Sequence, residues 1–271
     1  MIKTFLNSLT PPFIKQIVTV VRVRLQKKPE PIWVTLSSGR LKGIRFFIDP
    51  ISTIGKDYLN GHDEFIYTKL DKYKSIASPV FYDIGAHFGL HTLAFSLIAG
   101  KSGKVYAFEP HPLNKERLTK NISENIALCN NIIVIDKAIT DYKGSVNFEM
   151  ITDLESGWSS SSRILKENER TKDTDVKRNI EVATDALDNL VDDGTILKPD
   201  FIKIDVEGEE FKVLKGAIKT LLHFKPVLFI EIHSIECMYL IQNELNELGY
   251  KVDLLHIEPD GRCFISGEIL H

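Results

Sequence analysis

The distribution of apolar residues becomes regular from residue 80 onward. Short, almost continuously apolar runs alternate there with longer and more polar stretches. Runs of this kind are typical of strands buried on both faces of a parallel sheet, and the stretches between them are typical of crossover helices. The predicted strands cover residues 80–84, 104–108, 132–135, 201–204 and 227–232. The predicted helices cover residues 89–99, 112–126, 209–222 and 235–248.

Weaker patterns flank this core. Residues 32–48 predict a hairpin that turns at a Ser-Ser-Gly-Arg tetrapeptide, and a helix is predicted over residues 63–73. Near the end of the chain, apolar runs at 251–257 and 262–266 flank the turn-forming residues Glu-Pro-Asp-Gly. The chain is therefore expected to close with an antiparallel hairpin, after an α/β core with a doubly wound sheet.

One stretch interrupts the alternation. Residues 151–178 hold a small, polar run around Trp158 and a segment dense in charge, which predicts an insertion between two units of the sheet. A solvated loop and a lid that contacts the substrate through Trp158 are equally open interpretations. We divide the chain into an N-terminal extension at residues 1–55 and a main domain at residues 56–271 that carries this insertion.

Composition limits the classes of partner. The 271 residues are 43% hydrophobic and 26% charged, with a net charge of −3, so no excess of positive charge favours nucleic acid. Three separated cysteines indicate neither a disulfide framework nor a zinc site, and they favour a reducing, cytoplasmic location. Residues 1–29 are basic and contain no acid. This segment either packs on the domain or makes peripheral contact with the inner face of a membrane.

The turn after the first core strand holds the most informative chemistry. Asp83 ends the strand, and a turn through Gly85, Ala86, His87 and Gly89 leads into the helix. Ligands bind at the carboxyl ends of strands in open parallel sheets, so a cofactor is expected here. The Gly-x-Gly-x-x-Gly spacing of dinucleotide sites is missing. A carboxylate at this position suits a cationic ligand, and S-adenosylmethionine carries an ammonium and a sulfonium group.

The next two strand ends extend this site. Glu109 follows the second strand by the spacing at which an acid accepts hydrogen bonds from ribose hydroxyls, and Pro110 adjoins it. Asp136, Lys137 and Ala138 follow the third strand, where they are expected to border an adenine ring.

Acids gather after the fourth and fifth strands. Asp205 and Glu207 follow residues 201–204, and Glu231 and His233 end the next run. Asp205, His233 and Glu207 are our candidate catalytic residues, with Asp205 or His233 as the base for an acceptor hydroxyl. Glu209 and Glu210 are explained by the dipole of the following helix.

A divalent metal is the competing use of these acids. Asp205, Glu207 and Glu231 could hold magnesium, which prefers oxygen ligands. His87 and His91 have the spacing of two ligands on one helical face, but no metalloprotease motif accompanies them, and we interpret them as structural or as lining the cofactor. No metal is predicted.

Three blocks together resemble the FkbM family of methyltransferases. They are Asp-Ile-Gly-Ala-x-x-Gly at residues 83–89, Ala-Phe-Glu-Pro-x-Pro at 107–112 and Lys-Ile-Asp-Val-Glu-Gly-Glu-Glu at 203–210. The resemblance implies a class I, Rossmann-like fold with seven strands, the last antiparallel, and the use of S-adenosylmethionine. It also implies that residues 83–89 line the methionine part of the cofactor and that Glu109 holds its ribose. Asp205 and Glu207 would then lie at the methyl-transfer face.

The resemblance implies O-methylation of a hydroxyl on a sugar, a glycan or a natural product. Two rivals are an NAD-dependent oxidoreductase, which the missing glycine spacing disfavours, and a catalytically silent module that acts with a glycan-biosynthesis partner. The identity of the acceptor and the oligomeric state are left open by the sequence.

Overall fold

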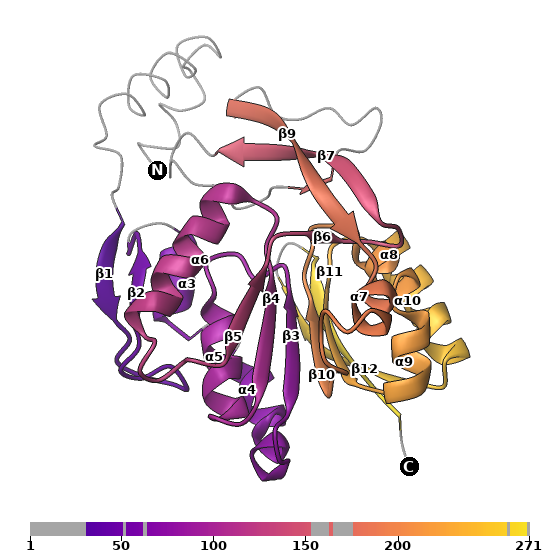
Figure 1. Cartoon of the computed structure of the whole chain (residues 1–271), viewed down its shortest axis with the longest axis horizontal. Helices are drawn as coiled ribbons and strands as arrows, with labels where there is room; N and C mark the ends of the chain where they lie inside the picture. The colour runs from indigo at the N-terminus through magenta and orange to yellow at the C-terminus, as the bar shows by residue number, and fades with distance from the viewer. Residues whose placement is uncertain are drawn as a thin grey trace, which may run out of the picture.

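A seven-stranded sheet forms the centre of the molecule, with helices on both faces (Figure 1). The computed structural model describes residues 31–50, 53–61, 64–152, 163–164, 176–258 and 261–269. The strand order is β12-β13-β11-β10-β3-β4-β5. The bounds are Val80–Ile84 for β3, Lys104–Phe108 for β4, Ile132–Ile135 for β5, Phe201–Ile204 for β10, Val227–Ile232 for β11, Lys251–Ile257 for β12 and Cys263–Glu268 for β13.

Five of these strands run parallel and occupy the residues predicted for them, namely β3, β4, β5, β10 and β11. Strand β13 pairs antiparallel with both β11 and β12, so the last strand is inserted beside β11 in the reverse direction. The predicted α/β sheet with its closing hairpin is therefore confirmed. Two buried clusters of apolar side chains, one on each face, hold the helices to the sheet.

One face is covered by elements from the first half of the chain. Strands β1 and β2 form the predicted antiparallel hairpin, and Phe46 and Ile48 of β2 are buried in the same cluster as Leu93 and Phe95 of α5. The elements are β1 (Ile32–Thr35), β2 (Arg45–Ile48), α3 (Thr53–Leu59), α4 (Glu64–Lys69), a 3-10 turn (Asp71–Ser75), α5 (Leu90–Ala99) and α6 (Pro112–Glu124). The helix predicted over residues 63–73 is thus a shorter helix followed by a 3-10 turn, and α3 was not predicted.

The other face is covered by α7 (Leu187–Asp192), α8 (Glu210–Lys215), α9 (Ile218–Phe224) and α10 (Ile235–Glu247). The single helix predicted over residues 209–222 was wrong, because it breaks between Lys215 and Ile218. A Cβ atom on Gly216 would lie 2.1 Å from the carbonyl oxygen of Thr140. The break therefore accommodates a backbone approach that only glycine permits.

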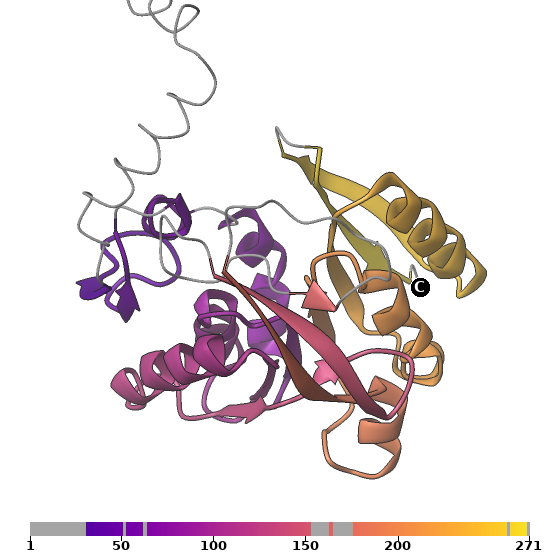
Figure 2. The same ribbon diagram turned by 90° about the horizontal axis from the view of Figure 1, so that it is seen from above.

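A second sheet, which the sequence did not predict, interrupts the main one after β5. Its order is β6-β9-β7-β8, with bounds Ala138–Ile139, Val176–Asp185, Gly144–Thr152 and Arg163–Ile164. Figures 1 and 2 show β7 and β9 as a long ribbon beyond the end of the main sheet where β5 leads into β6. Ile151 and Lys177 are paired within this ribbon, so the stretch at about residues 151–178 begins and ends inside β7 and β9, and its description as an insertion stays a prediction. Trp158 and the basic residues 1–29 lie outside the described residues.

Within the described residues, no helix combines the length and the apolar character needed to cross a membrane.

Candidate active site

The turn between β3 and α5 has the backbone conformation that its glycines predict. The φ angles of Gly85, His87 and Gly89 are 83°, 51° and 92°, which lie in the left-handed region. A Cβ atom on Gly85 would lie 1.8 Å from the carbonyl oxygen of Asp205. Gly85 thus lets this turn lie directly against the end of β10. The carboxyl ends of β3 and β10 therefore form one continuous edge of the sheet.

Lys203 joins these two strand ends, and the sequence analysis missed it. Its ammonium group donates hydrogen bonds at 3.2 Å to the carbonyl oxygen of Gly85 and at 3.2 Å to Oδ2 of Asp205. It also lies 3.4 Å from Oδ1 of Asp83. Burial acts to lower the pKa of Lys203, but Asp205 and Asp83 outweigh it, so the side chain stays charged. The sequence did contain a signal for Lys203, because a single lysine in a buried apolar strand needs a partner of opposite charge.

Asp83 is fully buried beneath this edge. The hydroxyl of Thr92 donates a hydrogen bond of 2.5 Å to its Oδ2 atom. With Lys203 on its other oxygen, Asp83 ties the end of β3 to both α5 and β10. Its predicted contact with the cofactor is not tested by this geometry, which shows a role in positioning the turn.

Glu109 lies at the end of β4 and faces the same turn. Backbone N–H groups of His87 and His111 donate to its two carboxylate oxygens at 2.7 and 2.9 Å. Burial raises the pKa of Glu109 to about 7, although these hydrogen bonds oppose the shift. Each carboxylate oxygen can accept a second hydrogen bond, so the group can still receive ribose hydroxyls.

The residues after β5 lie in three different settings. Asp136 pairs with Lys115 and leaves 59% of its side chain exposed. Lys137 forms an ion pair of 2.7 Å with the buried Asp185, and Ala138 is buried in β6. Pro110 is half-buried beside Glu109. The contact of Asp136, Lys137 and Ala138 with an adenine ring stays a prediction, as does the contact of Pro110 with the cofactor.

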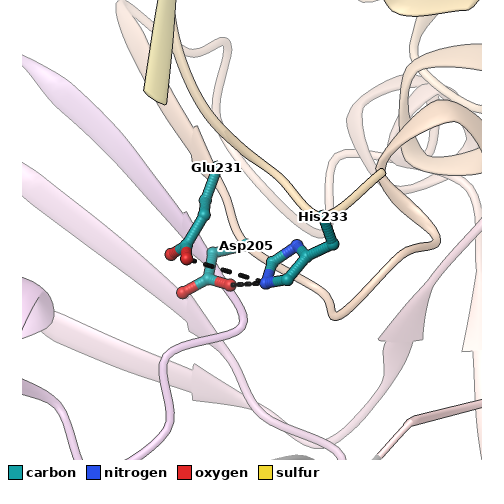
Figure 3. Close-up of side chains that lie close together, drawn as sticks. All are labelled: Asp205, Glu231 and His233. Atoms are coloured by element: carbon teal, nitrogen blue, oxygen red, sulfur yellow. Dashed lines mark ion pairs between the residues drawn. The ribbon is translucent and has the colours of Figure 1, made fainter. Parts of the chain in front are cut away.

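Asp205, Glu231 and His233 point toward one another at the ends of β10 and β11 (Figure 3). The Nε2 atom of His233 lies 3.8 Å from Asp205, 3.7 Å from Glu231 and 3.5 Å from Glu207. The structure therefore brings the three candidate catalytic residues together and adds Glu231 to them. We refer to Asp205, Glu207, Glu231 and His233 as the acidic edge.

Glu210 orients the imidazole of this edge. Its Oε1 atom accepts from Nδ1 of His233 at 2.8 Å, and it also accepts from the N–H of Gly208 at 2.8 Å. The thiol of Cys237 lies 3.0 Å from the other oxygen. The sequence analysis explained Glu210 by the helix dipole alone and missed this contact, because it depends on β11 and α8 lying side by side.

The ionisable groups of the acidic edge shift one another's pKa values. Burial and repulsion from Asp205 raise the pKa of Glu207 to about 7 and that of Glu231 to about 8. Burial acts to raise the pKa of Asp205 as well, but Lys203 and His233 outweigh it and the net shift is downward. Burial opposes the charge on His233, yet Glu210 and Asp205 raise its pKa to about 9. An edge of this kind fits a cationic ligand better than a pyrophosphate.

His87 in the turn and His91 at the start of α5 each contact a tyrosine of a neighbouring helix. Nδ1 of His87 is 3.2 Å from the hydroxyl of Tyr58 in α3, and Nδ1 of His91 is 2.9 Å from the hydroxyl of Tyr67 in α4. These contacts connect α3 and α4 to the turn and to α5, and a contact of His87 with the cofactor stays a prediction.

Comparison with known proteins gives a consistent result. Residues 83–252 match the family described as "Methyltransferase FkbM domain". The hexuronic acid methyltransferase AglP of Haloferax volcanii is 26% identical over 213 residues, which cover 74% of this chain and 80% of that protein. The solved structure of the methyltransferase FkbM from Methylobacillus flagellatus has a TM-score of 0.52 and 17% identity. That match covers 78% of this chain, which spans about half (52%) of the solved chain.

Proposed function

The chain belongs to the FkbM family and is a methyltransferase, and from this premise we propose that it methylates a hydroxyl group of a sugar with S-adenosylmethionine as the methyl donor. The relative from Haloferax volcanii, whose name specifies hexuronic acid, supports a sugar acid as the acceptor to test first. The absence of a dinucleotide glycine spacing and the acid-lined edge both disfavour the oxidoreductase alternative.

The residues of the turn supply a binding site of the right chemistry for the donor. Gly85, Ala86, His87 and Gly89 would surround its amino-acid part, with Asp83 beneath them. Glu109 would accept the ribose hydroxyls, and Pro110, Asp136, Lys137 and Ala138 would border the adenine. When bound, S-adenosylmethionine supplies a methyl group attached to a positively charged sulfur.

The acidic edge would act on the acceptor. Asp205, Glu207 and His233 offer hydrogen-bonding groups that can orient a sugar hydroxyl and receive its proton. Alignment of the two reactants supplies much of the acceleration in a displacement of this type, so the protein needs no covalent intermediate.

One observation carries the proposal. The ammonium group of Lys203 holds the carbonyl oxygen of Gly85 and the carboxylate of Asp205 at 3.2 Å each. Gly85 belongs to the turn that would bind the donor, and Asp205 belongs to the edge that would act on the acceptor. The proposed donor and acceptor halves of the site would therefore meet at one buried cation.

The test is transfer of a tritiated methyl group from S-adenosylmethionine to UDP-glucuronic acid, with UDP-glucose and UDP as matched acceptors. We expect a labelled product with a sugar nucleotide and none with UDP, and loss of transfer in the Glu109→Ala variant. The product should survive mild alkali, because a methyl ether is stable there and a methyl ester is not. A product that alkali destroys would overturn the hydroxyl as acceptor, and transfer to UDP itself would overturn the sugar.

A further inference from the structure

We propose that Asp205, Glu231 and His233 together bind one divalent transition-metal ion. The three residues come from β10 and β11, which run parallel and place their carboxyl ends side by side. One ligand atom from each residue lies within 4.8 Å of the other two. The set differs from the all-carboxylate set considered from the sequence, because the imidazole replaces Glu207.

The separations suit ligands around one centre better than direct contacts. Nε2 of His233 lies 3.8 Å from Oδ1 of Asp205 and 3.7 Å from Oε1 of Glu231, beyond hydrogen-bond distance. Two ligands that bind one ion at about 2.1 Å can be at most about 4.2 Å apart. Both separations therefore leave room for an ion between the imidazole and the carboxylates.

The imidazole supplies a second, independent observation. Its Nε2 atom is shielded from solvent and has no hydrogen-bond partner, and only 11% of the side chain is exposed. Its Nδ1 atom is fixed by the carboxylate of Glu210 at 2.8 Å. A histidine that binds a metal through one nitrogen usually donates its other N–H to a carboxylate in this way. The ring is thus oriented with a buried nitrogen, without a hydrogen-bond partner, that faces the carboxylates of Asp205, Glu207 and Glu231.

The local charge also favours a cation. Four carboxyl groups surround His233, namely Asp205, Glu207, Glu210 and Glu231. Lys203 contacts Asp205, and Arg262 pairs with Glu231 from a side chain that is 40% exposed. When the imidazole is neutral, as metal binding requires, two fixed cations face four carboxyl groups on a largely buried edge, where unpaired charge is costly. A divalent ion would reduce this excess.

The ligand types restrict the ion. Carboxylates suit Mg²⁺, Ca²⁺ and Mn²⁺, whereas imidazole suits Zn²⁺ and other first-row transition ions. A site with both types favours Mn²⁺ or Zn²⁺ over Mg²⁺. If the proposed function holds, on which this role rests, the ion would bind the acceptor hydroxyl and ease the loss of its proton.

The test is calorimetric titration of the metal-free full chain with Mn²⁺, with Zn²⁺ and Mg²⁺ as comparison ions. Electron paramagnetic resonance counts the bound Mn²⁺. No adenosyl ligand is added, so the positive charge of the donor plays no part. The variants are Glu231→Gln, His233→Gln and Glu210→Gln. Glu244→Gln is the matched control, because Glu244 of α10 pairs with Lys215 of α8, away from the three proposed ligands. Circular dichroism and thermal unfolding show whether each variant folds.

We expect one Mn²⁺ per chain, bound more tightly than Mg²⁺ and equally well by Glu244→Gln. Loss of a ligand in Glu231→Gln or His233→Gln should weaken binding at least tenfold, and loss of the orienting carboxylate in Glu210→Gln should weaken it about 10- to 100-fold. No saturable binding by the wild-type chain would overturn the proposal, whatever the variants do. Equal binding by the wild-type chain and all folded variants would overturn it too.

These outcomes are separate from those for the proposed function. Metal binding without methyl transfer would leave the site standing and remove its role in methylation. Transfer that survives complete removal of the metal, by a chain that binds no Mn²⁺, would overturn the metal site and leave the methyltransferase.

Discussion

Lys203 reaches from β10 to the carbonyl oxygen of Gly85, so a buried ammonium group holds the turn after β3 in place. The same group lies between the carboxylates of Asp83 and Asp205. Removing it would take this cation from the buried Asp83 and the partly buried Asp205, which makes Lys203 the first residue to change.

We expect Lys203→Met to lower the free energy of unfolding by about 3–5 kcal/mol, the usual cost of breaking a buried ion pair from one side. Urea denaturation measures this change. Lys219→Met is the matched control, because Lys219 pairs with Asp192 at the surface and exposed pairs contribute about 0–1 kcal/mol. An equal loss of unfolding free energy in the two variants would show that the charge of Lys203 stabilises the fold no more than an exposed lysine does.

Gly85→Ala tests the contact between the turn and β10. A left-handed alanine costs about 1–2 kcal/mol, and overlap with a neighbouring group adds about 1–3 kcal/mol, so we expect a loss of roughly 2–5 kcal/mol. The control is Gly194→Ala, since Gly194 has a φ of 75° and open space around its Cβ position. Thermal unfolding of both variants separates the cost of the left-handed backbone, which both share, from the cost of the overlap with Asp205, which only Gly85→Ala has. If Gly85→Ala lost no more stability than Gly194→Ala, the backbone contact with Asp205 would be wrong.

Glu109 predicts a pH dependence of donor binding. Burial raises its pKa from 4.5 to about 7, so the neutral acid persists well above the pH at which an exposed glutamate ionises. The ionised form accepts more hydrogen bonds, so affinity for S-adenosylmethionine should rise between pH 6 and 8 by up to about tenfold. Asp83 opposes ionisation of Glu109, whereas Asn114 and the N–H groups of His87 and His111 favour it.

Calorimetric titration at several pH values measures this rise, and Glu109→Gln is the control because glutamine does not titrate. The variant should bind more weakly than the wild-type chain at pH 8 and show a flatter profile. An identical rise in Glu109→Gln would assign the pH dependence to other groups.

Asp205→Asn should separate turnover from donor binding. The amide keeps an oxygen that can accept from Lys203 but receives a proton poorly, so we expect kcat to fall about 10²- to 10⁴-fold. Affinity for S-adenosylmethionine should change less than threefold. The methyl-transfer assay and calorimetry give the two values, and Asp192→Asn at the surface should leave both unchanged. A wild-type kcat in Asp205→Asn would exclude Asp205 from the reaction.

The central strands of the main sheet, β3, β10 and β11, could be predicted because they are buried on both faces. Residues 80–84 and 227–232 are therefore almost continuously apolar, and their observed bounds match the predicted ones. The second sheet gives no such signal. Buried and exposed residues alternate in β9 where its side chains are described, and β9 pairs with β7 across more than twenty intervening residues. The charged residues before and at the start of β9 therefore suggested a loop rather than a strand.

The residues of the site could likewise be predicted only where the local sequence marks them. Glu109 and Asp205 could be predicted because they directly follow recognisable strands. The partner of His233 could not, because Glu210 lies 23 residues earlier and reaches it only once α8 packs beside β11. Local sequence explains Glu210 equally well as a helix-dipole residue, so only the folded arrangement distinguishes the two roles.

The second sheet leaves and rejoins the main domain at neighbouring points. Ala138 and Ile139 pair with Thr184 and Asp185, so the chain departs and returns side by side. A longer or shorter excursion between these points would change little in the register of the main sheet, because the added cost of loop closure grows slowly with length. Evolution could therefore exchange this ribbon as a module while the main sheet and the turn after β3 stay the same.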